Sequence, residues 1–158
     1  MKPDIAIGDN ARKQVAAALR GTLADTFVLY AKTHGFHWNV VGPDFSQLHG
    51  FFEEQYRALW EALDELAERI RSLGELAPAS LKEMQESASL EESSGQPSAA
   101  QMLQQLLTGH EGVIKSARKT LEVAEKGGDE VTVDLMVERL AYHEKTAWML
   151  RSHLEKAG

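Results

Sequence analysis

Apolar side chains recur at every third or fourth position in four long stretches of this 158-residue chain, and prolines stand only between or before those stretches. This spacing is typical of amphipathic helices, in which about 3.6 residues complete a turn. The four prolines occupy positions 3, 43, 78 and 97, and proline breaks a helix interior. No stretch alternates strictly between apolar and polar residues as a strand does. The pattern therefore predicts an all-α chain.

The predicted helices cover residues 11–36, 45–73, 98–127 and 129–154, with a short helix near 80–86. Side chains that can cap helix starts precede four of them, and glycines follow where helices end. The predicted N-caps are Asp44 (with Gln47), Ser80 (with Glu83), Ser98 (with Gln101) and Asp129, and Gly74 is the predicted C′ glycine.

The lengths of the connections predict how the helices are arranged. Short turns after the first and third long helices predict antiparallel neighbours, whereas the long connection at 75–97 predicts a crossover, as in ferritin-like bundles. We therefore expect a ferritin-like four-helix bundle with a short extra helix between the second and third long helices. The expected organisation is one domain over 1–158, with a short N-terminal tail at 1–10.

Composition narrows the range of functions. The formal net charge is −7, from 24 acidic and 17 basic residues, whereas proteins that hold nucleic acid usually carry the opposite imbalance. The chain has no cysteine, which excludes disulfides, iron–sulfur clusters and thiol nucleophiles. No apolar run approaches the roughly 20 residues of a membrane span, and no secretory signal is recognisable. We expect a cytoplasmic protein that does not enter membranes.

A second stripe of side chains lies on the helix predicted at 45–73. Its members share an arc of roughly 100° that is turned by about 110–130° from the apolar stripe. One histidine with three carboxylates suits iron, manganese or zinc. Because this face points away from the chain's own core, a second chain would have to close such a site. The stripe consists of His49, Glu53, Trp60, Asp64 and Glu68.

This stripe has a simpler interpretation as a solvated helix face. Trp60 argues against it, because a large aromatic side chain directed at solvent indicates an interface. The first long helix also ends in two histidines followed by a tryptophan, His34, His37 and Trp38. Such histidines more often cap a helix or pack in a core, and that alternative stays open.

A conventional di-iron site inside one bundle is excluded by inspection. Such sites use Glu-x-x-His pairs on two helices, and none of the six histidines has a glutamate three positions before it. His110 and His143 fall in apolar stripes, so we expect hydrogen-bonded core histidines there. His153 is expected on the surface near the end of the last helix.

The segment from His34 to His49, followed by the segment 64–70, resembles the Dps family, the mini-ferritins named for DNA-binding proteins of starved cells. The resemblance continues through 128–134 and 143–150. It implies hollow dodecameric shells of four-helix subunits, with ferroxidase centres at the two-fold interfaces between subunits.

Residue by residue, the resemblance also implies a ligand set. His37 and His49 would come from one subunit, Asp64 and Glu68 from its partner, and Glu53 would lie near the second metal position. The implied reaction is oxidation of ferrous iron, preferably by hydrogen peroxide, followed by storage of ferric mineral in the cavity. Iron is the only metal implied.

Three further residues match family positions. Trp38 resembles a tryptophan proposed to donate electrons near the centre, although packing at the interface explains it equally well. Asp129 and Asp134 match acidic residues that line three-fold iron-entry pores. Their simpler roles are an N-cap and a first-turn acid, each favoured by the helix dipole.

The chain departs from the family in its tails. Family members that bind DNA often use lysine-rich tails, and here Lys2 is the only basic residue before Arg12. We expect weak DNA binding or none. The alternative functions are a nucleoid-associated DNA-binding protein with little ferroxidase role and a purely structural bundle, which would leave the His/Asp/Glu set unexplained.

Overall fold

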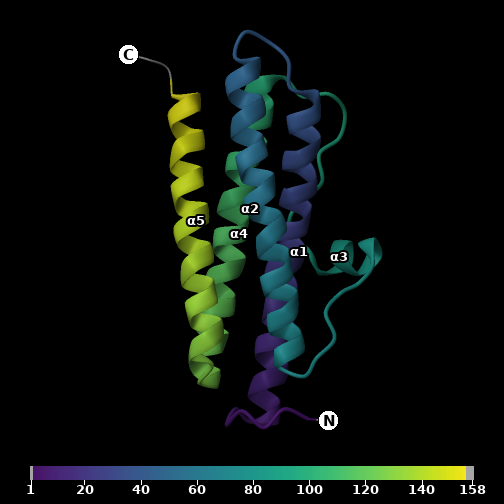
Figure 1. Cartoon of the computed structure of the whole chain (residues 1–158), viewed down its shortest axis with the longest axis vertical. Helices are drawn as coiled ribbons and strands as arrows, with labels where there is room; N and C mark the ends of the chain where they lie inside the picture. The colour runs from purple at the N-terminus through teal and green to yellow at the C-terminus, as the bar shows by residue number, and fades with distance from the viewer. Residues whose placement is uncertain (1, 156–158) are drawn as a thin grey trace.

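The computed structural model describes residues 2–155, and this part of the chain contains five helices and no strand. The long helices are α1 (Asp9–Asn39), α2 (Phe45–Ser72), α4 (Ala99–Gly127) and α5 (Glu130–Leu154), and α3 (Leu81–Ser87) is short. Figure 1 shows the four long helices side by side, with α3 standing apart beside α1. The predicted all-α, ferritin-like architecture with one short extra helix is confirmed.

The packing order of the helices follows from the connections. Helix α1 packs against α2 and α4, α4 packs against α5, and α3 contacts α1. The crossover from α2 to α4 travels the length of the bundle and carries α3 (Figure 1). In the described part of the chain, no helix combines the length and apolarity that crossing a membrane requires.

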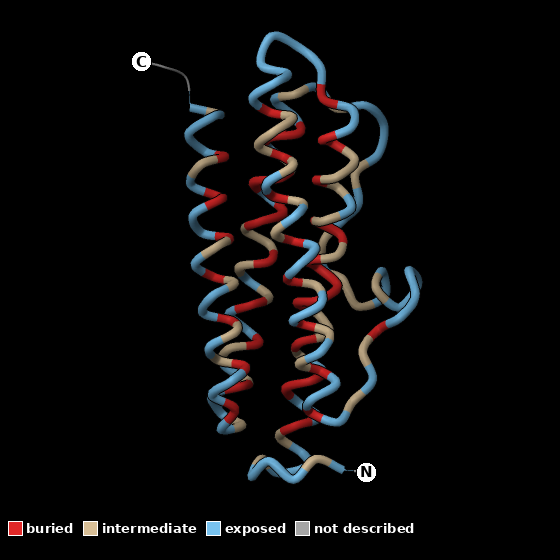
Figure 2. The backbone as a smooth tube through the Cα atoms, viewed as in Figure 1, coloured by how far each residue is buried: buried red, intermediate tan, exposed pale blue. Residues whose placement is uncertain are grey.

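Buried side chains form two clusters inside the bundle, one toward each end. Figure 2 shows the buried positions turned inward on all four long helices. Phe52 and Leu59 belong to the cluster near the α1–α2 turn, and Leu66 and Ile70 belong to the other. These four α2 residues are fully buried, so the predicted apolar stripe is the face that packs in the core.

Most of the predicted caps are confirmed. Ser80 with Glu83 and Ser98 with Gln101 each form a complete capping box. The Asp129 side chain accepts a hydrogen bond from the Thr132 N–H and caps α5. These caps are local, because each joins residues three positions apart.

Asp44 occupies the predicted N-cap position of α2, but its side chain does not cap the helix. Its side chain makes no cap hydrogen bond, and the backbone there is turned, with φ −94° and ψ 17°, whereas an N-cap residue is typically extended. The turn is closed by the Phe45 N–H donating to the Gly42 carbonyl at 3.1 Å. Helix α1 also extends beyond the predicted 11–36, from Asp9 to Asn39.

A buried carboxylate holds the crossover against the bundle. Asp25 on α1, 1% exposed, accepts hydrogen bonds from the Ser89 N–H at 2.6 Å, the Ser89 hydroxyl at 2.9 Å and the Leu90 N–H at 3.0 Å. The Leu90 side chain occupies the space that a side chain at Gly112 on α4 would need. The crossover is therefore fixed to two helices despite its polar composition.

The segment before α1 folds under the bundle. Buried Arg12 donates to the Ile7 carbonyl at 2.7 Å, to Asp9 at 2.6 Å and to the Leu73 carbonyl at the end of α2 at 3.2 Å. The Lys2 ammonium donates to Asp9 at 2.6 Å. The side chains of Lys2 and Arg12 are thus both hydrogen-bonded to other groups of the chain.

Candidate metal centre

Two histidines face each other where α1 ends and α2 begins. The His37 Nδ1–H donates to the His49 carbonyl oxygen at 2.8 Å, and the His49 Nδ1–H donates to the His37 carbonyl oxygen at 2.9 Å. Their rings stack with centroids 3.8 Å apart and planes at 20°. Each helix therefore orients the ring carried by the other helix.

This reciprocal pairing determines which nitrogen of each ring can bind a metal. A carbonyl oxygen only accepts hydrogen bonds, so both Nδ1 atoms carry protons. In a neutral imidazole the other nitrogen, Nε2, then keeps its lone pair. A backbone carbonyl behind a ligand histidine is the usual way in which proteins set its tautomer and orientation. His37 and His49 are thus prepared to bind a metal through Nε2.

Glu53 lies one turn after His49 on α2 and is paired with Arg57. The Arg57 Nε and Nη2 atoms both donate to the same oxygen, Oε1, at 2.9 and 2.6 Å. This hydrogen bonding lowers the pKa of Glu53, and the nearby His37 and His49 act in the same direction. The carboxylate therefore lies within electrostatic reach of the histidine pair.

Aromatic side chains surround the histidines on the α1–α2 face. His34 stacks on Tyr56 with centroids 3.8 Å apart, and the Tyr30 hydroxyl lies 3.2 Å from His34 Nδ1. Partial burial lowers the pKa of His34. Trp38 is 67% exposed and Trp60 is 61% exposed. The exposure of Trp60 confirms that the second stripe points away from the core.

Sequence reasoning missed the roles of two residues next to the histidine pair. It assigned no role to Tyr56, although the Tyr56 ring meets the His37 ring edge-on, with the ring centroids 5.1 Å apart. It did not single out Arg57, although an arginine four positions after a glutamate on a helix is a recognisable ion-pair signal.

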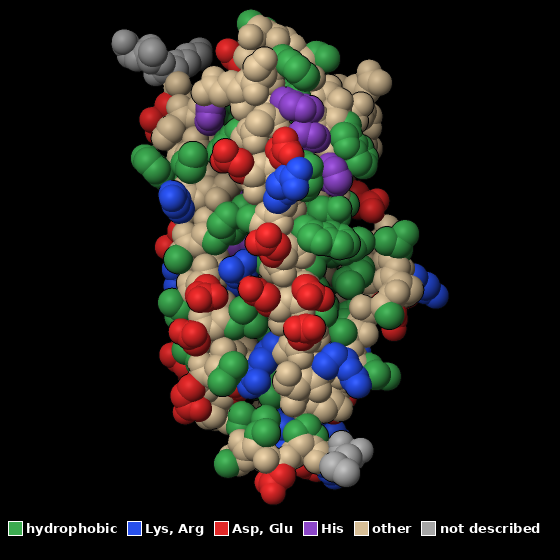
Figure 3. Space-filling view, viewed as in Figure 1, with side chains coloured by type: hydrophobic (Ala, Val, Ile, Leu, Met, Phe, Trp, Pro, Cys, Tyr) green, Lys and Arg blue, Asp and Glu red, His purple; other side chains and the backbone are tan. Residues whose placement is uncertain are grey.

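The two remaining predicted ligands lie elsewhere on the same helix. Asp64 and Glu68 are exposed, and Asp64 follows His49 by 15 positions, about 22 Å along a helix. Among the described residues no three His, Cys, Asp or Glu side chains come close enough together to hold a metal ion. In Figure 3, histidines gather toward one end of the visible face and acidic side chains continue along it. Their joining in one site stays a prediction.

The two predicted pore residues differ in their surroundings. Asp129 is 1% exposed and accepts from Arg69 Nη2 at 2.5 Å as well as capping α5. Its charge is therefore compensated within the chain. Asp134 is exposed on the next turn of α5. A role for either in an iron-entry pore stays a prediction.

A second histidine pair lies inside the bundle, where core histidines were predicted. His110 and His143 are fully buried, with their Nδ1 atoms 2.9 Å apart. His110 Nε2–H donates to Gln55 Oε1 at 3.1 Å. His110 Nδ1 must then accept the proton of His143 Nδ1. The prediction of hydrogen-bonded core histidines is confirmed, and His153 is exposed as predicted.

Burial keeps this inner pair neutral. It lowers the pKa of His110 to about 3, and it lowers the pKa of His143 well below its ordinary value, with His110 and Arg139 adding to the effect. Among the described atoms, His143 Nε2 and Gln55 Nε2 have no hydrogen-bond partner. No carboxylate belongs to this hydrogen-bonded group, so it lacks the anionic ligands of a di-iron site.

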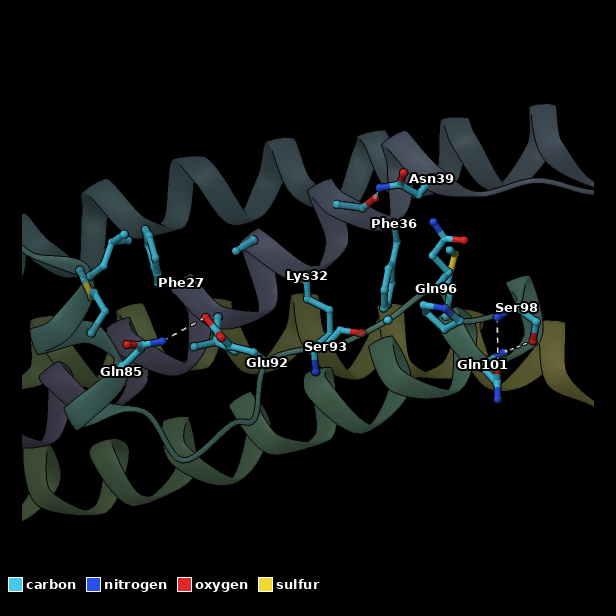
Figure 4. A pocket seen from close by; sticks show the side chains of 18 of the residues that line it. Phe27, Lys32, Phe36, Asn39, Gln85, Glu92, Ser93, Gln96, Ser98 and Gln101 are labelled. Atoms are coloured by element: carbon cyan, nitrogen blue, oxygen red, sulfur yellow. Dashed lines mark hydrogen bonds between the residues drawn. The ribbon is translucent and has the colours of Figure 1, made fainter.

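A groove of about 1040 Å³ lies between α1 and the crossover. Figure 4 shows Lys32 extending from α1 toward Ser93 across this groove. Partial burial lowers the pKa of Lys32. The groove is lined by none of the predicted ligands, so it is separate from the candidate metal centre.

A four-helix bundle with one long crossover is the architecture of ferritin-like proteins. Comparison with known proteins gives the same class: the sequence profile described as "Ferritin-like domain" matches residues 16–157. This match covers most of the chain, including all of α2, α4 and α5.

The relatives narrow the class to one family. The "DNA protection during starvation protein 2" of Bacillus anthracis is 38% identical over 144 residues, covering 91% of this chain and 99% of that protein. The structure of Dps from Vibrio cholerae O1, described as a member of the ferritin-like diiron-carboxylate superfamily, has a TM-score of 0.93, 34% identity and coverage of 98% and 97%. Dps from Thermosynechococcus elongatus gives a TM-score of 0.90 at 32% identity, with 94% of each chain covered. The chain belongs to the Dps family.

Proposed function

We propose that this chain assembles into a dodecameric shell, oxidises ferrous iron at centres shared between subunits and stores the ferric product inside. Hydrogen peroxide is the preferred oxidant, and consuming it together with iron limits oxidative damage. The observation that carries this proposal is the reciprocal pairing of His37 and His49, which leaves an oriented Nε2 lone pair on each ring where α1 meets α2. Family membership supports it.

A two-fold axis explains how one chain can supply both halves of the site. In a two-fold interface the same surface meets itself, so a group away from the axis on one subunit faces a different group on the other. An axis across α2 would bring Asp64 and Glu68 of one subunit to His37 and His49 of its partner. The exposed Trp60 on the same face suits burial in such an interface.

The proposed ligands are of two kinds, imidazoles and carboxylates, which suit different oxidation states of iron. Neutral imidazoles suit the ferrous substrate, and the carboxylates of Glu53, Asp64 and Glu68 favour the harder ferric product. Two ferrous ions give up one electron each, and one peroxide takes both electrons with two protons to form two waters. When only one ferrous ion is bound, Trp38, next to His37, is the proposed donor of the second electron that the peroxide needs. Asp129 and Asp134 are the proposed pore acids.

Several relatives are named for the protection of DNA during starvation, and DNA binding is the alternative function for this chain. The structure favours weak binding or none for this chain, because Lys2 and Arg12 are already engaged by Asp9 and by backbone carbonyls. A net charge of −7 on each subunit adds repulsion from phosphates.

The test replaces one ligand from each half of the proposed site. His49→Ala and Asp64→Ala are each expected to slow peroxide-dependent iron oxidation by about tenfold or more, since even an outer partner of a metal ligand is typically worth 10–100-fold. Helix content by circular dichroism should not change, because both residues lie outside the core. Glu122→Ala, at an exposed position on α4, is the matched control.

Co-assembly tests the sharing of the site between subunits. Mixed shells of the His49→Ala and Asp64→Ala chains should regain part of the activity, because some interfaces then combine an intact histidine half with an intact carboxylate half. An undiminished rate in either single variant would refute its role as a ligand, and mixed shells without recovered activity would refute the shared site.

A further inference from the structure

Three charged residues follow one another at four-residue intervals on α2: Glu53, Arg57 and Glu61. Residues four apart on a helix are neighbours on its surface. Arg57 is paired with Glu53, whereas Glu61 has no ion pair within 4.0 Å in the described part of the chain. Arg57 therefore lies between the Glu53 carboxylate, with which it forms an ion pair, and the Glu61 carboxylate, with which it does not.

We propose that Arg57 is a latch that controls loading of the second metal position. It holds Glu53 while that position is empty and moves one turn along α2 to Glu61 when iron takes Glu53. This inference rests on the proposed function and specifies how the same site is regulated.

The argument starts from the geometry of the existing pair. Both guanidinium bonds go to one oxygen, Glu53 Oε1, and arginine cannot lose its proton in a protein. A divalent ion that binds Glu53 must therefore displace the guanidinium or remain beside a fixed positive charge. In the single chain these side chains are exposed by 67% and 37%, and an exposed ion pair of this kind contributes about 1 kcal/mol or less.

The surroundings supply a place for the displaced guanidinium. A hollow of about 280 Å³ is lined by Arg57 and Glu61 together with Tyr30, Tyr56 and Trp60. The guanidinium carbon already lies 5.8 Å from the centre of the Tyr56 ring, and aromatic faces attract cations. Arg57 can therefore move from Glu53 toward Glu61 along an aromatic surface without entering the core.

The latch predicts that the two metal positions fill in order. Among the described residues no Lys or Arg side chain is hydrogen-bonded to His37 or His49, so the first metal binds without displacing Arg57. The second metal competes with Arg57 for Glu53 and binds more weakly. Arg57 is thus a positioning residue: it acts through Glu53 and does not touch the reacting atoms.

The experiment measures stepwise binding of Co²⁺, a redox-inert substitute for ferrous iron, to assembled shells by anaerobic titration calorimetry. Arg57→Gln should raise the affinity of the weaker step by about two- to fivefold, the range expected for an exposed ion pair. The affinity of the stronger step should not change. Arg57→Lys keeps the charge and should return the weaker step to near the wild-type value.

Two further variants distinguish the latch from a general effect of changing the charge of the protein. Glu61→Gln removes the second resting place and should weaken the second step by about twofold. Arg118→Gln removes the same kind of exposed pair, with Glu144 at 2.5 Å, on α4 and α5, and should change neither step. An Arg57→Gln protein with an unchanged second step, or an Arg118→Gln protein with an equal gain, overturns the latch. Failure of all shells to bind Co²⁺ overturns the proposed metal centre itself.

Discussion

Acid should destabilise this protein through its buried histidine pair well before the carboxylates are protonated. His110 and His143 lie in the middle of the bundle, bonded to each other and to Gln55. Neither can accept a second proton without placing a charge in the apolar core. In the unfolded chain both rings are free to be protonated, so acid favours unfolding.

The size of the effect follows from the pKa of His110, which is lowered from 6.5 to about 3 by burial. Between these values the unfolded state binds a proton that the folded state does not, so stability falls as the pH falls. Each unit of pH in this window costs about 1.4 kcal/mol. Acidifying from pH 7 to pH 5 should therefore lower the free energy of unfolding by about 2 kcal/mol through His110 alone. His143, whose pKa is also lowered, adds to the loss.

The assay is urea unfolding at pH 7 and pH 5, with the assembly state followed by light scattering. His110→Gln keeps a polar side chain but removes one titrating ring, so its loss between the two pH values should be about 2 kcal/mol smaller than that of the wild type. His153→Gln, at an exposed position, is the control and should lose as much as the wild type. Equal losses in wild type and His110→Gln would refute the reasoning.

Three other outcomes are expected. Arg12→Met should lower the free energy of unfolding by about 1–3 kcal/mol, because it removes buried hydrogen bonds, and should speed proteolysis of the N-terminal segment. Lys13→Met, at an exposed position, should do neither, and equal proteolysis of the two variants would contradict the prediction. Gly109→Ala should lower the melting temperature, because its Cβ would lie 2.6 Å from a Leu29 methyl. Gly21→Ala should raise the melting temperature, because no atom lies within 4 Å of its Cβ and alanine has the higher helix propensity. The reverse order of melting temperatures would refute the packing argument. Metal-free protein should not retard plasmid DNA in a gel at pH 7.5 in physiological salt, and tight, salt-sensitive retardation would refute that prediction.

Much of the fold follows from local sequence patterns. The capping boxes at Ser80 and Ser98 could be predicted because each depends on residues three positions apart. Asp44 was correctly predicted at the N-cap of α2, but its side chain makes no cap hydrogen bond, because the turn closed by the Gly42 carbonyl determines its backbone. Asp25 was not predicted to hold the crossover, because its partners lie 64 and 65 positions away.

The candidate site was predictable in its residue types and only partly in its geometry. The helical spacing of His49, Glu53 and Asp64 was enough to show that they lie off the core face. The bonds between His37 and His49 depend on how two helices dock, which no helical period specifies. The pairing of Glu53 with Arg57 could be predicted from their four-residue spacing. Its place beside the histidine pair became clear only from the structure.

The reciprocal bonds between His37 and His49 also bear on the order of events in folding. They join residues only 12 positions apart, so they form within the α1–α2 hairpin at a small cost in loop-closure entropy. A slip of α2 by one residue along α1 would break both hydrogen bonds together. The histidine pair therefore stabilises one register of the hairpin over the others. Under the proposed arrangement, the histidine half of each centre is then complete before any two chains meet, and assembly adds carboxylates to a ligand pair that already exists.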